Sequence, residues 1–87
     1  MRKQYTEVLK SFFQEKVYNR RKNMGISQEE MASRLEMGCR GYARLDQGQR
    51  CCSALTLALF LIYICEDPLS FLQELRHALE ECNSEAA

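Results

Sequence analysis

The sequence predicts an all-α domain of five helices, on three observations. Apolar side chains recur at spacings of three and four residues along most of the chain, which is the period of an amphipathic helix, and no segment alternates as a strand would. A single Pro and four Gly leave long stretches free of helix breakers. The length of 87 residues, with 46% hydrophobic and 28% charged side chains, fits one globular domain. We therefore expect residues 1–87 to form a single helical domain.

The first helix is expected from Tyr5 to about Lys22. Gly25 follows it and supplies the left-handed conformation that a helix C-terminus often requires. Seven apolar side chains fall on one stripe of this helix and predict its buried face: Tyr5, Val8, Leu9, Phe12, Phe13, Val17 and Tyr18.

Two short helices are expected next. Ser27 and Glu30 have the spacing of a capping box, S-x-x-E, which starts the second helix. Residues 36–38 form a turn, and the third helix follows over residues 39–47. The side chains expected to face inward from this pair are Met31, Ala32, Leu35, Tyr42 and Leu45. Two short helices joined by a tight turn, here over residues 27–48, are the sequence form of a helix-turn-helix.

The last two helices follow a second pair of start signals. Ser53 is the expected N-cap of a fourth helix over residues 54–65. Asp67 followed by Pro is the start signal of a fifth helix over about residues 68–81, with residues 83–87 as a frayed tail. The fourth helix is apolar on nearly every side, which is more than one core-facing stripe requires. We expect the fifth helix to cover part of that surface and a second copy to cover the rest, in a homodimer through helices four and five.

Charge is balanced overall but unevenly distributed. Residues 1–50 contain eleven Lys or Arg and six Asp or Glu, a net of +5, whereas residues 51–87 contain one Arg and six acids, a net of −5. Such asymmetry is typical of a polyanion-facing end and a solvated or partner-facing end.

The longest apolar run, residues 54–65, is shorter than the roughly 20 residues that a bilayer needs. No signal-peptide pattern is visible, and we expect a cytoplasmic protein without a membrane partner.

The cysteine pattern predicts reduced thiols. Five Cys without a secretory signal argue against a disulfide framework. No C-x-x-C occurs and His77 is the only His, so a structural zinc site lacks its usual ligand spacing. No nucleophile elbow, phosphate-binding Gly loop or paired-carboxylate motif is present. We expect no catalytic residues, no metal, no cofactor and no enzymatic activity.

The order of residues in the helix-turn-helix segment resembles a known family. Residues 20–35 read RRKNMGISQEEMASRL, which is similar to the pattern R-x-x-x-G-[LI]-[ST]-Q-E-x-[LM]-A-x-x-L of the Cro/phage-repressor type (xenobiotic-response-element-like) helix-turn-helix family. Residues 42–53 read YARLDQGQRCCS, similar to the family's [IV]-x-[RK]-[IWL]-[ED]-x-G-x-R-x-x-[SD]. The resemblance covers roughly residues 12–65. It implies a five-helix lambda-repressor-like domain and a sequence-specific transcriptional regulator, a small repressor that binds double-stranded DNA.

The resemblance also implies roles for individual residues. The third helix would read base edges in the major groove with Cys39, Arg40, Ala43 and Arg44. Backbone phosphates would be contacted by Gln28, Gln47 and Arg50. A structural ion pair would join Arg21 and Asp46. This sequence differs from the family in three places: the family usually has Gly at the position of Glu36, Ser or Thr at that of Gly38, and Pro at that of Cys52.

Two other interpretations remain open from the sequence. A protein-interaction module on the same fold, with weak or no DNA binding, is favoured by the neutral net charge, by Glu36 in the turn, by Gly41 in the third helix and by the excess apolar surface of the fourth helix. In that case the exposed Arg side chains would only be solvated charges. A thiol or metal sensor would require the sulfur atoms of Cys39, Cys51 and Cys52 to lie close together.

Overall fold

The computed structural model describes the backbone of residues 2–86 and the side chains of residues 2–82, and it confirms the all-α class. The helices are, in chain order, α1 (Arg2–Met24), α2 (Gln28–Arg34), α3 (Cys39–Asp46), α4 (Ala54–Leu59) with its continuation η1 (Phe60–Ile64), and α5 (Pro68–Ala86). Residues 2–86 contain no strand.

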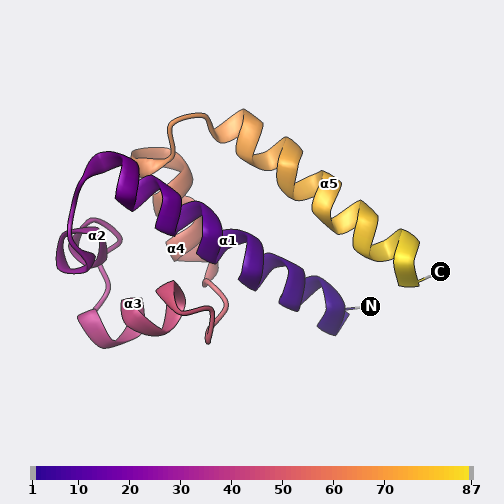
Figure 1. The fold of residues 1–87 in the computed structure, drawn as a ribbon, viewed down its shortest axis with the longest axis horizontal. Helices are drawn as coiled ribbons and strands as arrows, with labels where there is room; N and C mark the ends of the chain where they lie inside the picture. Colours follow the sequence, from indigo (N-terminus) through magenta and orange to yellow (C-terminus); the bar gives the residue numbers. More distant parts are fainter. Residues whose placement is uncertain (1, 87) are drawn as a thin grey trace.

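Helix α1 is the centre of the fold, and it packs against α3 and against α5. Helix α2 packs against α3. Figure 1 shows α5 returning beside α1 in the opposite direction, so that α1 begins and α5 ends at the same end of the molecule. The molecule is elongated, with extents of 41 × 25 × 20 Å. Helices α2 and α3 lie toward the other end of its long axis.

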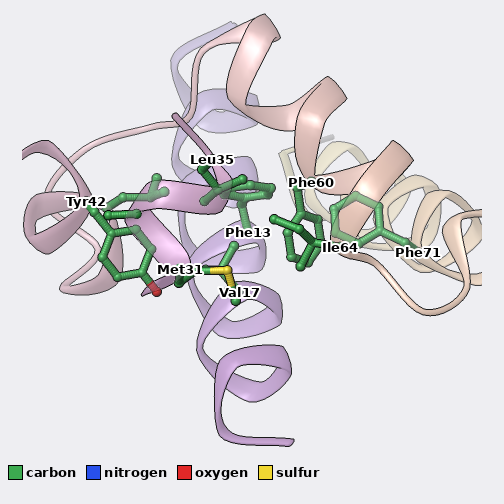
Figure 2. Packing of buried hydrophobic residues seen from close by; sticks show 10 residues of the cluster. Phe13, Val17, Met31, Leu35, Tyr42, Phe60, Ile64 and Phe71 are labelled. Carbon is green, nitrogen blue, oxygen red and sulfur yellow. The ribbon is translucent and has the colours of Figure 1, made fainter. Parts of the chain in front are cut away.

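The core is built around Phe13, which has no exposed surface. Figure 2 shows Phe13 between two groups of side chains. The first comes from α2 and α3, and the second is aromatic, with Phe60 5.2 Å and Phe71 6.4 Å from the Phe13 ring in edge-to-face geometry. Ten hydrophobic residues are buried among the described side chains: Phe13, Val17, Met31, Ala32, Leu35, Tyr42, Leu45, Phe60, Ile64 and Phe71. All five side chains expected to face inward from α2 and α3 are among them.

Helix boundaries differ from the prediction mainly at the chain ends. Helix α1 begins at Arg2 rather than at Tyr5, because good helix formers precede Tyr5 and nothing interrupts them. The predicted frayed tail is wrong for residues 83–86, where α5 continues as a helix to Ala86. No Gly or Pro follows Pro68, so no residue in this stretch stops the helix. The remaining tail residue, 87, lies outside the described residues.

The predicted fourth helix over residues 54–65 is divided into an α-helical and a π-helical segment. The π turn η1 closes with a bond from the Cys65 N–H to the Phe60 carbonyl, 2.7 Å. Both Phe60 and Ile64 are buried, and the Arg20 Nε donates to the Ile64 carbonyl at 2.8 Å. A run of apolar residues fits either helix type, so the sequence contains no signal that separates them.

Three helices end in the same backbone motif. After each helix one residue adopts a positive φ, and the next N–H bonds to a carbonyl five residues earlier, as in a Schellman motif. The residues with positive φ are Gly25 (66°), Glu36 (53°) and Gly48 (73°). Glycine adopts this conformation without strain, whereas a residue with a Cβ does so at a cost of about 1–2 kcal/mol. Glu36 is therefore a strained position at the end of α2.

Replacing Glu36 with Gly is expected to stabilise the protein. The substitution removes left-handed strain in the folded state and adds chain entropy to the unfolded state, which leaves a net gain of about 0.5–1 kcal/mol. Urea unfolding of the wild type and of Glu36→Gly measures this difference. The control Glu36→Ala keeps the Cβ and should show no such gain. Equal gains in both variants would mean that removal of the Glu36 charge, and not backbone strain, is responsible.

The N-terminal caps support the predicted helix starts. The Ser27 Oγ accepts from the Glu30 N–H, and the Ser53 Oγ accepts from the Thr56 N–H, each at 3.1 Å. The Asp67 carboxylate accepts from the Ser70 N–H at 3.2 Å. The capping box at Ser27 is only half formed, because the Glu30 carboxylate pairs with Arg34 instead.

Candidate nucleic-acid interface

Helix α3 separates its residues into a buried face and an exposed face. Tyr42, Leu45 and Asp46 are buried against the rest of the domain. Of the four residues predicted to contact bases, Cys39, Arg40 and Arg44 are exposed and Ala43 is half-buried. Arg40 and Arg44 are four residues apart on the helix and project from the same side. The two guanidinium groups therefore share one solvent-facing surface.

The segment after α3 adds a third guanidinium to that surface. Gln47 and Arg50 are both exposed. The Arg50 Nη1 lies beside the turn of α3 that contains Gly41, 3.9 Å from where a Cβ on that glycine would be. Among the described side chains, no ion pair engages Arg40, Arg44 or Arg50, whereas Arg20, Arg21, Arg34 and Arg76 all have carboxylate partners. We call Arg40, Arg44 and Arg50 the arginine surface.

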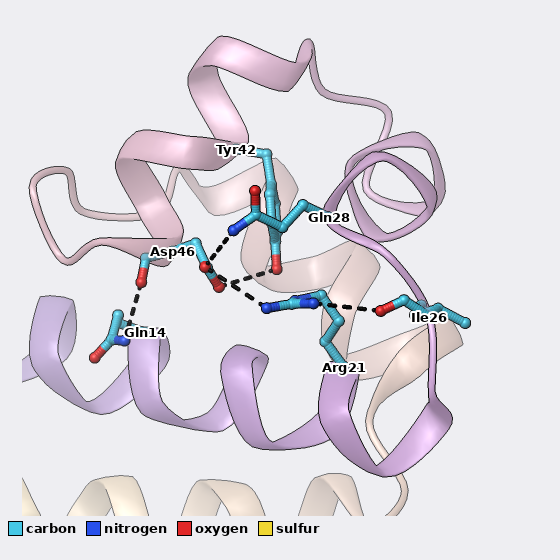
Figure 3. Close-up of polar contacts among 6 residues, drawn as sticks. All are labelled: Gln14, Arg21, Ile26, Gln28, Tyr42 and Asp46. Atoms are coloured by element: carbon cyan, nitrogen blue, oxygen red, sulfur yellow. Dashed lines mark hydrogen bonds and ion pairs between the residues drawn. The ribbon is translucent and has the colours of Figure 1, made fainter.

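A polar network around the Asp46 carboxylate fixes α3 relative to α1 and α2 (Figure 3). The Tyr42 hydroxyl donates to Asp46 Oδ1 at 3.2 Å, and the Gln28 Nε2 donates to Asp46 Oδ2 at 3.0 Å. The Gln14 Nε2 donates to the Asp46 backbone carbonyl at 3.0 Å. One residue at the C-terminal end of α3 is thus bonded to side chains from α1, α2 and α3 itself.

Arg21 supplies the positive charge of this network. Its Nη2 lies 3.9 Å from Asp46 Oδ2, which is a long separation for an ion pair, and its Nη1 donates to the Ile26 carbonyl at 3.3 Å. Arg21 and Asp46 are each only 8% exposed. The Arg21 Nε is buried without a hydrogen-bond partner among the described residues. Because both charges are largely desolvated, removing one of them would leave the other uncompensated.

Gln28, predicted to contact a phosphate, is bonded within the protein by one of its N–H groups. A carboxamide has two N–H donors, and the bond to Asp46 uses one. The residue itself is exposed. The second N–H makes no hydrogen bond among the described residues, while the first keeps the side chain in place.

Burial raises the pKa of Tyr42 to about 12, and the neighbouring Asp46 carboxylate adds to the effect. A tyrosinate at this position would be desolvated and would face a negative charge. The folded-state pKa exceeds the unfolded value of about 10, so the folded state favours the protonated phenol. The resulting stabilisation is complete below about pH 10 and is lost as the pH rises toward 12.

This shift predicts a loss of stability in alkali that depends on Tyr42. Between pH 8 and pH 11 the tyrosine should contribute a loss of about 1.4 kcal/mol in unfolding free energy, as follows from a rise of two pKa units. Urea unfolding at both pH values measures it in the wild type and in Tyr42→Phe. The Phe variant should lose less stability than the wild type by that amount, since other titrating groups are common to both. Equal losses would contradict the shifted pKa.

Two members of the Asp46 network, Tyr42 and Gln14, are not predicted as site residues from the sequence. Tyr42 and Asp46 are four residues apart on one helix, so their side-chain contact follows from a spacing that the sequence displays. Gln14 is 32 residues from its acceptor, and its bond depends on how α1 and α3 pack. No local pattern signals a contact of that kind.

The cysteines do not gather into a metal site. Cys39 is exposed on α3, whereas Cys51 and Cys52 are half-buried in the loop before α4. The described part of the chain contains no group of three or more His, Cys, Asp or Glu side chains placed to hold a metal ion. Burial raises the pKa of the Cys52 thiol to about 12, with a smaller contribution from Cys51. A thiol with so high a pKa is poorly suited to thiolate chemistry near neutral pH.

A second exposed feature lies on α4 and η1. Leu55, Ile62 and Tyr63 are 66%, 69% and 76% exposed. The predicted excess of apolar surface on the fourth helix is therefore present, because α5 leaves these three side chains uncovered.

None of the helices within residues 2–86 is both long enough and apolar enough to cross a bilayer.

Comparisons with protein-family models, with curated proteins and with solved structures found no match to this chain.

Proposed function

We propose that this protein is a sequence-specific DNA-binding transcriptional regulator of the helix-turn-helix type, acting in the cytoplasm as a small repressor. The observation that carries the proposal is the arginine surface, where Arg40, Arg44 and Arg50 are exposed and have no carboxylate partner among the described side chains. Exposed guanidinium groups with fixed spacing on one helix face suit both guanine edges and phosphates.

In this proposal the two arginines of α3 read bases. Arg40 and Arg44 would each donate two N–H groups to the O6 and N7 atoms of a guanine in the major groove. Cys39 and Ala43 lie on the same part of the helix and present small side chains, which would allow the helix to approach the base edges closely. The interaction is noncovalent and requires no cofactor.

Phosphate contacts would set the position of the helix in the groove. Arg50 beside α3, Gln47 at its C-terminal end and the free N–H of Gln28 are the proposed donors. The Asp46 network supports them, since it holds α3 and the Gln28 side chain in one arrangement before DNA arrives. Preorganised groups of this kind lose less entropy on binding.

The distribution of charge is consistent with this orientation. The net charge of +5 in residues 1–50 belongs to the part of the chain that contains α3, and the net charge of −5 belongs to residues 51–87. Opposite potentials would orient the protein as it approaches a polyanion. Pairing of two copies is part of the proposal, because helix-turn-helix proteins read paired half-sites about one helical turn apart.

Fluorescence anisotropy tests the proposal. Two labelled duplexes, one from upstream of the protein's own coding sequence and one scrambled, are titrated at about 50 and 200 mM salt. A complex with six to ten phosphate contacts should weaken by roughly 10³–10⁵-fold across that interval. Binding that is salt-sensitive and prefers the upstream duplex supports an autoregulating repressor. Absence of binding to either duplex at low salt would overturn the proposal.

A protein-interaction module is the second candidate, favoured by the exposed apolar side chains of α4 and η1. Leu55, Ile62 and Tyr63 are each exposed over 66% or more of their surface. Exposed apolar groups clustered on one element are typical of protein contacts. In that case complex formation would depend weakly on salt, and replacing Arg40 and Arg44 would not change it.

A further inference from the structure

The free ends of α1 and α5 form a feature that DNA recognition does not use. We call residues 2–10 of α1 and residues 72–82 of α5 the arm. Figure 1 shows these two segments running side by side in opposite directions at the end of the molecule away from α2. Helix α3 lies on the opposite side of α1 from α5. A partner at the arm would therefore leave the outer face of α3 accessible.

The arm contains an apolar groove of about 500 Å³. Its floor and walls come from Tyr5 on α1 and from Leu72, Leu75 and Leu79 on α5, and Arg76 and Glu80 also line it. Those two charged side chains pair with each other at 3.0 Å. Leu72 is 48% exposed, and Leu69, one turn before it, is 66% exposed. The apolar strip along α5 is thus wider than α1 can cover, and its burial by a partner would be favourable.

The two helices of the arm have opposite net charges. Residues 2–10 contain three bases and one acid, a net of +2, and residues 72–82 contain one base and three acids, a net of −2. In a two-fold dimer the same patch on both copies meets itself, so α1 of one copy can lie beside α5 of the other. Such an arrangement places opposite charges together twice.

We propose that the arm groove binds a second copy of this chain in a two-fold dimer. In this dimer the basic end of α1 from each copy lies against the acidic α5 of the other copy. The inference rests on the proposed function only for its consequence, which is that two arginine surfaces would be presented to paired half-sites. The sequence predicts a dimer surface formed by the fourth and fifth helices. The arrangement proposed here retains α5 in that surface and replaces α4 with α1.

Charge and shape favour the arm over the exposed side chains of α4 and η1. Residues 54–65 contain no charged side chain, so that surface has no electrostatic means of fixing the register of a partner. The groove combines a concave apolar surface with charged helices of both signs. A second copy matches those features without a further assumption about another protein.

Sedimentation velocity on the full chain tests the dimer with a matched pair of variants. Leu72→Glu puts a charge in the groove, and Leu55→Glu puts the same charge on α4, at a position that is also well exposed. We expect Leu72→Glu to raise the dimer Kd at least about tenfold, as for residues central to an interface, and Leu55→Glu to change it less than about twofold. Far-UV circular dichroism verifies that both variants stay helical.

Charge reversal tests the arrangement of the two copies. Lys3→Glu and Glu81→Lys should each weaken the dimer by about two- to tenfold, because each affected pair occurs twice. An equimolar mixture of the two single variants should recover most of the wild-type affinity, because in the mixed dimer each reversed charge on one copy meets an opposite charge on the other copy, while α1 and α5 within each copy do not. Lack of recovery would overturn the pairing of α1 with α5. A wild-type chain that is monomeric at all concentrations, or a dimer that Leu55→Glu dissociates as strongly as Leu72→Glu does, would overturn the proposal as a whole.

These outcomes are distinguishable from failure of the proposed function. Monomeric Leu72→Glu should still bind a duplex with a single half-site in a salt-dependent manner. If wild type and variants all fail to bind DNA while the dimer responds as expected, the proposed function is wrong and the arm dimer stands.

Discussion

Replacing both Arg40 and Arg44 with Ala is expected to abolish most of the sequence preference in DNA binding. Each bidentate arginine–guanine contact contributes about 1–3 kcal/mol of discrimination, so the double variant should lose about 30-fold to 10⁴-fold in preference. The structure supports this because both side chains are exposed on one face of α3 without an ion-pair partner among the described side chains. Anisotropy titrations with the preferred and the scrambled duplex measure the loss.

The matched control is Arg34→Ala. Arg34 is also an exposed arginine, but its guanidinium already pairs with Glu30 at 3.1 Å on α2. Its removal should change the ratio of affinities for the two duplexes by less than about threefold, since an exposed pair contributes little. If the double variant at Arg40 and Arg44 retained both its affinity and its preference, the assignment of α3 as the recognition helix would be wrong.

Replacing Asp46 with Ala is expected to produce the largest loss of stability, about 3–5 kcal/mol. The change leaves the Arg21 guanidinium buried without its carboxylate, and it removes the acceptor of the Tyr42 hydroxyl and of the Gln28 amide. Urea unfolding followed by circular dichroism measures the effect. Asp46→Asn keeps the shape and one acceptor oxygen but not the charge, so it should fall between Ala and the wild type.

Glu30→Ala provides the control for loss of a carboxylate. Glu30 pairs with Arg34 at the surface, where both side chains are well exposed. Its loss should cost no more than about 1 kcal/mol. A cost for Asp46→Ala as small as that of Glu30→Ala would show that the Asp46 network does not hold α3 in place.

Much of the fold could be predicted because helical periodicity determines which side chains face inward. Phe13 and Val17 belong to the predicted stripe of α1 and are buried, and Ser53 and Asp67 cap the helices whose starts they predict. The stripe rule was less accurate at its edge, since Tyr18 is 40% exposed and lies near the cationic groups of Arg21 and Lys22. A stripe has a width that depends on the helices packed against it, and a single sequence does not specify that width.

The π turn and the full length of α5 could not be predicted for different reasons. In η1, the burial of both Phe60 and Ile64 and the bond from Arg20 involve residues far apart in the chain. For α5, the final residues have weak helical preference alone, and the helix continues because no residue stops it. Local propensity therefore predicts where the fourth and fifth helices begin better than it predicts where they end or which helix type they adopt.

The candidate site was predictable where it depends on one helix and not where it depends on several. The exposure of Arg40 and Arg44 follows from their spacing against Tyr42 and Leu45. The bonds from Gln14 and Gln28 to Asp46 require α1, α2 and α3 to be assembled first. The Asp46 carboxylate is negatively charged and attracts an N–H of the Gln28 amide. Gln28 therefore has a hydrogen bond within the protein in addition to its predicted contact with a phosphate.

Amide chemical-shift mapping tests the central claim most directly. Isotope-labelled protein is titrated with the preferred duplex and with the scrambled duplex at low salt, and shifts are followed residue by residue. We expect the largest shifts in residues 39–50, with smaller shifts near Gln28 and with little change in residues 54–64. Shifts confined to α4 and η1, or no shifts with either duplex, would contradict recognition of DNA by the arginine surface.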